Sequence, residues 1–141
     1  MSIDDNKAVV TRLVESINSR ALDRLAKLVA SDVVDHNAVI FMQPEGPGGV
    51  EEGIRMLLNG FPDLRIAIHD LIGEADTVVA RLTVSGTNLG EYRGLPQPTN
   101  QRFEMEAVAI FRLEHGTVAE IHGTADRLGM LVQLGILPDI G

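Results

Sequence analysis

The sequence of 141 residues contains no cysteine. Without thiols the chain cannot form disulfides, thiolate metal sites or iron–sulfur clusters, and it has no cysteine nucleophile. Its four histidines are the remaining candidates for a base near neutral pH or for a metal ligand. They form no His-Glu-x-x-His helix and no closely spaced pair, the arrangements typical of zinc sites. We therefore expect no metal site.

Basic residues and long apolar runs are also scarce. Lys and Arg number 12 against 20 Asp and Glu, so the net charge is −8, and no basic block could neutralise a phosphate backbone. No apolar run approaches the roughly 18 residues that span a bilayer. Residues 1–5 are acidic where a signal peptide would be basic. We expect a cytoplasmic protein whose partners are neither nucleic acids nor membranes.

The length suits one domain over residues 1–141, because a chain of about 150 residues buries roughly 68–70% of its unfolded surface. Apolar residues first recur at helical spacing and later alternate with polar ones, which predicts helices followed by strands. The predicted helices cover residues 4–20, 22–29, 50–59 and 126–134, and the predicted strands cover residues 64–69, 78–85, 102–113 and 117–124. This order predicts an α+β fold: a strongly curved antiparallel sheet whose concave face is covered by the N-terminal helices, with a pocket between the layers.

The last predicted strand carries the residues best suited to proton transfer. Alternation places Glu120 and His122 on one face, and Asp126 at the strand end has the same parity. A carboxylate inside an apolar cavity loses its hydration, which raises the pKa of a carboxyl group and makes it a competent base. In the alternative interpretation, Glu120 pairs with Arg112 on the neighbouring strand and Asp126 only caps the last helix. The sequence leaves both interpretations open.

Further polar candidates are histidines and their neighbours. His36, beside Asp35 and Asn37, could hydrogen-bond a substrate or a carboxylate, but isolated histidines are commonly surface or satisfied core residues. The same two alternatives hold for His69 and His122. Serine hydrolase chemistry is not indicated, because Gly-x-Ser-x-Gly is absent. The glycine clusters lack the strand-turn-helix context of nucleotide-binding loops.

Five segments together resemble one known family. They are residues 34–37, 85–96, 110–112, 116–120 and 126–135. The closing pattern, Asp-x-x-Gly-x-Leu-x-Gln-Leu-Gly, is the most specific of them. In this order, over most of the chain, they resemble the SnoaL-like polyketide (ester) cyclases. The resemblance implies the cone-shaped α+β barrel of the nuclear transport factor two-like superfamily and a homodimer or homotetramer.

The resemblance also implies a reaction. Cyclases of this family close a ring on an aromatic polyketide by intramolecular aldol chemistry, without a cofactor, and the aspartate of the closing motif moves the proton. That catalytic role would fall to Asp126, with His122 beside it. The substrate would contact the remaining polar candidates, which are His36, Asn37, His69, Asn88 and Glu120.

Two positions depart from the family pattern. Asn88 stands where many members have His, and His122 stands where a Trp commonly precedes the aspartate by four residues. A polar His122 could position a water or a hydroxyl group, so hydroxylation of an anthracycline-type aromatic and epoxide hydrolysis stay open as alternatives. A third possibility is a non-catalytic module that only binds a ligand, because fold does not determine function.

Overall fold

The computed structural model describes all residues except 38–42, 47, 93–94, 96 and 141. Its helices are α1 (Ile3–Asn18), α2 (Leu22–Leu28), α3 (Gly49–Gly60) and α4 (Arg127–Gln133). Its strands are β1 (Val29–Asn37), β2 (Arg65–Glu74), β3 (Thr77–Thr87), β4 (Arg102–Glu114) and β5 (Thr117–Ala125). The predicted α+β fold is confirmed. No helix in the described part of the chain is long and apolar enough to cross a membrane.

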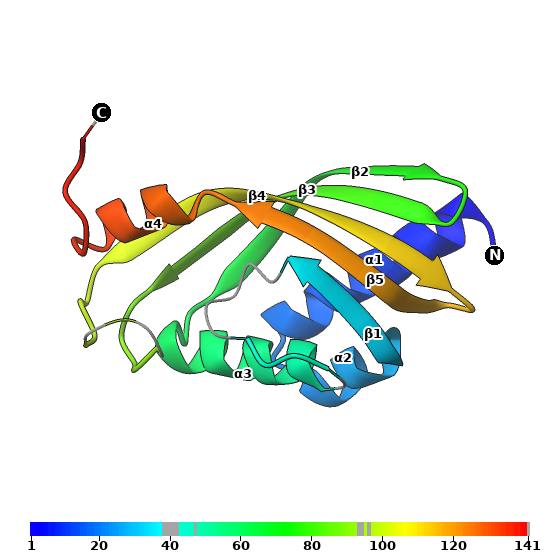
Figure 1. Cartoon of the computed structure of the whole chain (residues 1–141), viewed down its shortest axis with the longest axis horizontal. Helices are drawn as coiled ribbons and strands as arrows, with labels where there is room; N and C mark the ends of the chain where they lie inside the picture. Colours follow the sequence, from blue (N-terminus) through cyan, green and yellow to red (C-terminus); the bar gives the residue numbers. More distant parts are fainter. Residues whose placement is uncertain (38–42, 47, 93–94, 96, 141) are drawn as a thin grey trace.

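The strands form a curved sheet in the order β1-β5-β4-β3-β2. Strands β2 to β5 pair antiparallel with one another, as predicted. Strand β1 pairs parallel with β5 and places Asp35 opposite Ile121, so the sheet is mixed rather than antiparallel throughout. The sequence by itself predicts no strand in this segment. Figure 1 shows the sheet arching over α1, α2 and α3, which lie on its concave side.

Helix α1 is fixed at both of its ends. At the start, Ser2 Oγ accepts a hydrogen bond from the Asp5 N–H (3.0 Å), and the Asp5 carboxylate accepts one from the Ser2 N–H (3.2 Å). At the end, the Asn18 amide donates to the Ile66 carbonyl oxygen (2.9 Å) and accepts from the Ile66 N–H (2.8 Å). Val9 and Val10 are buried on the side that faces the sheet. The helix is thereby held across the concave face beside β2.

The central strands place alternate side chains on the two faces of the sheet. The inward-facing side chains of β3 and β4 are apolar and buried: Val78, Ala80, Leu82 and Val84 of β3, and Phe103, Met105, Ala107 and Phe111 of β4. They pack with the apolar sides of the helices into a buried cluster. The concave side of the sheet is therefore the inside of the molecule, and the outward-facing residues lie on its opposite face.

Asp63, in the turn between α3 and β2, ties that turn to the end of β3. Its carboxylate accepts hydrogen bonds from the Thr87 N–H (2.7 Å) and the Thr87 hydroxyl (2.8 Å). Burial alone would raise the pKa of Asp63, but these two hydrogen bonds outweigh it and hold the pKa below the ordinary 3.8. Because the folded-state pKa is the lower one, the carboxylate stabilises the fold above the unfolded-state pKa. This contribution is lost as the pH falls through the folded-state pKa.

We therefore expect Asp63→Asn to lower the free energy of unfolding at neutral pH by about 1 kcal/mol, a value reduced for the exposure of the turn. The difference from the wild type should shrink as the pH is lowered below 3.8, the ordinary carboxyl pKa, and through the lowered folded-state pKa. Urea unfolding of both proteins at neutral pH and at a pH below 3.8 measures it. A difference of equal size at both pH values would contradict the assigned role of the ionised carboxylate.

Candidate functional site

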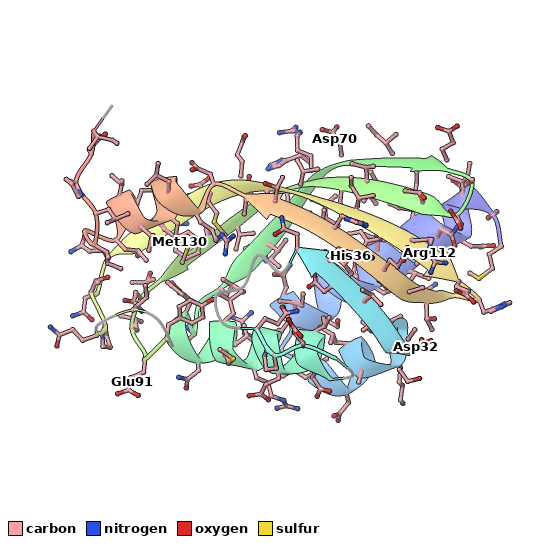
Figure 2. The ribbon with its side chains drawn as sticks, in the orientation of Figure 1. Asp32, His36, Asp70, Glu91, Arg112 and Met130 are labelled. Carbon is pink, nitrogen blue, oxygen red and sulfur yellow. The ribbon has the colours of Figure 1, made fainter. Side chains whose placement is uncertain are left out.

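A cavity of about 280 Å³ lies between the concave face of the sheet and the helices. Most of its lining is aliphatic and comes from every layer of the fold, for example Leu13 of α1, Ile54 of α3, Ala107 of β4 and Met130 of α4. Figure 2 shows Met130 on the inner side of α4. An apolar cavity with few polar groups is the usual form of a binding site for a small organic molecule.

Two of the described residues that line the cavity carry a charge, Asp35 and Arg127. The other polar lining residues are Asn37, Gln43, Tyr92 and Thr124. Arg127 is an exposed residue at the start of α4, whereas Asp35 is a half-buried residue of β1. Within the apolar part of the cavity, Asp35 is therefore the side chain best able to exchange a proton.

Strand alternation in β1 explains why Asp35 points inward. Val33 is buried, its neighbours Val34 and His36 are exposed, and Asp35 has the parity of Val33. Asp35 Oδ2 accepts a hydrogen bond from Gln43 Nε2 (2.9 Å). Its Oδ1 is shielded from solvent and has no hydrogen-bond partner among the described residues. A buried polar atom without a partner is rare, and a catalytic role is one of the explanations for it.

Asn37, at the end of the same strand, also lines the cavity. Its Nδ2 donates a hydrogen bond to the Gly123 carbonyl oxygen of β5 (2.6 Å). Asn37 is thus the one residue of the predicted site that is found in the cavity lining among the described residues. Its amide holds the ends of β1 and β5 together beside Asp35.

The structure brings His36, Glu120 and His122 together, but on the outer face of the sheet. The rings of His36 and His122 are stacked, with their centroids 4.2 Å apart. Glu120 accepts a hydrogen bond from Arg112 Nε (2.6 Å) and lies 3.4 Å from His36 Nε2. The hydrogen bond from Arg112, with a smaller contribution from His36, holds the pKa of Glu120 below its ordinary value. Figure 2 shows His36 and Arg112 along β5.

Asp126 is exposed at the start of α4, where its Oδ1 accepts a hydrogen bond from the Gly129 N–H (2.9 Å). It caps the helix and is not among the residues that line the cavity. Both contacts of the alternative interpretation, the Glu120–Arg112 pair and the Asp126 cap, are thus present. The catalytic roles of Asp126 and His122 stay predictions.

The other two predicted substrate contacts lie away from the cavity lining. Asn88 is fully buried, its Nδ2 donates to the carbonyl oxygens of Gly60 and Gly90, and its Oδ1 accepts from the Thr99 N–H. These bonds join two loops to the end of α3. His69 lies on the outer face of the sheet, within hydrogen-bond distance of the Thr83 hydroxyl. A role for either in substrate binding stays a prediction.

Asp35 is the functional candidate that the sequence analysis named only as a neighbour of His36. The parity that Asp35 shares with Val33 and Asn37 becomes a signal only once residues 29–37 are known to form a strand. The described residues contain no group of three or more His, Asp or Glu side chains that could hold a metal ion. Among the described residues, the cavity lining thus presents one carboxylate in apolar surroundings. This arrangement suits proton transfer to or from carbon.

Comparisons with known proteins agree with the α+β fold. A family model described as SnoaL-like polyketide cyclase matches residues 7–134. No curated protein sequence matches the chain significantly.

Solved structures from three Streptomyces species are similar over nearly the whole chain. AclR of Streptomyces galilaeus, a proposed hydroxylase, is 30% identical with a TM-score of 0.83, and the match covers 99% of this chain and 87% of AclR. TsrD of Streptomyces laurentii is 26% identical with a TM-score of 0.85, over 97% of this chain and 99% of TsrD. IdmH of Streptomyces antibioticus, a proposed polyketide cyclase, is 29% identical with a TM-score of 0.79, over 92% of this chain and 98% of IdmH.

Proposed function

Because the chain belongs to the SnoaL-like polyketide cyclase family, we propose that it closes a ring on a polyketide by an intramolecular aldol reaction inside the apolar cavity. The observation that carries the proposal is the Asp35 carboxylate in a cavity lined mostly by aliphatic side chains. A polyketide chain is largely apolar and has acidic carbon-bound protons between its carbonyl groups. Its body suits the aliphatic lining, and its reacting carbon suits a carboxylate base.

In the proposed reaction, the Asp35 carboxylate removes a proton from a carbon between two carbonyl groups of the bound polyketide. The resulting enolate carbon attacks a second carbonyl carbon of the same chain, which forms the new carbon–carbon bond. The protonated Asp35 then gives its proton to the alkoxide oxygen, so the product has the mass of the substrate. Proton transfer of this kind contributes about 10²–10⁴-fold to the rate.

The shape of the cavity contributes through positioning. The cavity can hold a flexible chain with its two reacting carbons in contact, so the entropy cost of bringing these carbons together is paid before the reaction. Where the geometry is ideal, this lowers the activation barrier by up to roughly 7–11 kcal/mol. Leu82, Ala107 and Ala109 line the sheet side of the cavity, and Leu57 lines the α3 side. These side chains would set the fold of the bound chain.

Asp126 is the alternative base, as the family resemblance implies. This alternative requires the Asp126 carboxylate to give up its hydrogen bond to Gly129 and to reach a substrate at the edge of the cavity beside Arg127. The two assignments differ in which carboxylate can be neutralised without loss of turnover.

Hydroxylation is a second candidate, favoured by the 30% identity to AclR, a proposed hydroxylase. It would use the same cavity and would transfer one atom of molecular oxygen to the substrate, while a two-electron reductant reduces the other atom to water. Incubation of the purified protein with an uncyclised aromatic polyketide ester, in air and with an added two-electron reductant, followed by mass spectrometry, separates the two reactions. A rearranged product of unchanged mass supports cyclisation, a gain of one oxygen supports hydroxylation, and no turnover of any such substrate would contradict both.

We also propose that the outer face of the sheet binds a second copy of this chain. Ile72, Val108 and Ile110 are exposed there, at 65%, 36% and 40% of their surface. The same face carries both signs of charge, in the Arg81–Asp70 and Arg112–Glu120 pairs. An apolar centre flanked by charges of both signs is self-complementary under twofold symmetry.

Ile110→Glu is therefore expected to shift the protein from dimer or tetramer to monomer, because it would place two carboxylates against each other in an apolar interface. Sedimentation equilibrium measures the change. Ile140→Glu is the matched control, since Ile140 is 85% exposed in the C-terminal tail, outside the strands that form this face. A wild-type protein that sediments as a monomer would contradict the proposed interface.

A further inference from the structure

The Gln43 side chain lies between the cavity carboxylate and helix α3. Its Nε2 donates a hydrogen bond to Asp35 Oδ2 at 2.9 Å, and the side chain is part of the cavity lining. With Oδ2 engaged, Oδ1 is the oxygen of Asp35 that has no partner among the described residues. A single hydrogen bond from a neutral donor thus orients the Asp35 carboxyl group.

The other side of Gln43 rests on a glycine of α3. A Cβ atom built on Gly53 would lie 2.6 Å from Gln43 Oε1 and 2.7 Å from Gln43 Cγ, closer than non-bonded atoms approach. Gly53 is buried inside the helix, where glycine is less favourable than alanine. The missing side chain is therefore the feature that leaves room for the Gln43 amide beside Asp35.

We propose that Gln43 is a positioning residue that holds the Asp35 carboxylate in the orientation for proton transfer. Because Gly53 has no side chain, it leaves the space that Gln43 needs for this contact. This inference rests on the function proposed above. The geometry needed for proton transfer is narrow, since donor and acceptor must come within about 2.6–3.2 Å. A carboxylate free to rotate about its side-chain torsions would spend less time in that geometry, so the loss would fall on kcat rather than on KM.

Two variants remove the contact in different ways. Gln43→Met keeps the length of the side chain and removes the donor, whereas Gly53→Ala keeps the donor and displaces it. Alanine is the better helix former, and the clashing atoms belong to a flexible side chain, so Gly53→Ala should fold as stably as the wild type. Glu52→Ala, at an exposed neighbouring position of the same helix, is the matched control.

Each of the two variants should lower kcat about tenfold, the usual effect of losing one charge-assisted hydrogen bond, with KM within about twofold. The double variant Gln43→Met/Gly53→Ala should be no slower than Gln43→Met alone, because Gly53 acts through Gln43. Glu52→Ala should keep the wild-type kcat. Additive losses in the double variant would overturn the role of Gly53.

A second measurement does not depend on turnover. In the ¹⁵N–¹H spectrum of the labelled protein, the side-chain amide signal of Gln43 should move in Asp35→Asn, where a neutral oxygen replaces the carboxylate as acceptor, and in Gly53→Ala, where the amide is displaced. It should stay in place in Glu52→Ala. An unmoved signal in the first two variants would overturn the proposed contact.

The two proposals fail in distinguishable ways. If Asp35→Asn is inactive and Gln43→Met keeps the wild-type kcat, the positioning role is overturned and Asp35 stays the base. If Asp35→Asn keeps full turnover, the proposed base is wrong, and the positioning role is overturned with it.

Discussion

Replacement of Asp35 by Asn is expected to lower kcat by about 10²–10⁴-fold with little change in KM, because it removes the general base and keeps the shape of the cavity. The amide of Asn cannot take a proton from carbon, but it can still accept the hydrogen bond from Gln43. Steady-state kinetics on the polyketide ester that the wild type converts would measure the loss. Circular dichroism and thermal unfolding of the variant show whether the fold is kept.

Asp126→Asn is the matched control for this prediction. Asn is as good an N-cap as Asp, so the bond to the Gly129 N–H and the stability of α4 should be kept. If Asp35 is the base, Asp126→Asn should keep a kcat close to that of the wild type. A collapse of kcat in Asp126→Asn, with full activity in Asp35→Asn, would contradict Asp35 and support the assignment implied by the family resemblance.

Phe61→Ala is expected to cost about 3–5 kcal/mol of unfolding free energy, a large share of the stability of a domain of this size. The Phe61 side chain is fully buried at the end of α3. Its ring makes edge contacts with Phe103 (centroids 4.9 Å apart) and with Tyr92 (5.5 Å). Alanine would leave a cavity and would remove both aromatic contacts. Urea unfolding monitored by circular dichroism measures the loss.

The control for this change is Phe61→Leu, which fills most of the same volume. It should cost roughly 1.5 kcal/mol, because only the edge contacts and part of the volume are lost. Equal losses for Ala and Leu would contradict a packing role for the ring. Since Tyr92 also lines the functional cavity, Phe61→Ala should weaken substrate binding at temperatures where the variant is still folded.

Most of the fold could be predicted from the sequence because its signals are local. The helical spacing of Val9, Val10 and Leu13 and the alternation of Val78, Ala80 and the residues after them are properties of short windows, and each window forms the predicted element. Strand β1 lacks such a signal, since Val33 is its one fully buried residue. Its pairing with β5 joins segments more than eighty residues apart, so only the tertiary structure could reveal it.

The candidate site, like the fold, could be predicted from the sequence only in part. The sequence predicted a pocket between a curved sheet and the helices, and it identified the polar segment that contains Asp35, His36 and Asn37. It could not tell which of these side chains point inward, because successive residues of a strand face opposite sides and the strand itself was not recognised. The family resemblance directed attention to Asp126, which the structure places at the helix cap.

By itself the sequence determined the α+β class, the segments that become helices and the antiparallel strands, and the family. The fold class, these segments and the family can be recognised from periodicity and motifs, which are properties of short runs of consecutive residues. Only the tertiary structure decided that Asp35 shares the apolar cavity with Gln43 while His36, Glu120 and His122 gather on the opposite face. The reason is physical: the face that a β1 side chain occupies depends on the register of that strand against β5, and long-range pairing sets this register.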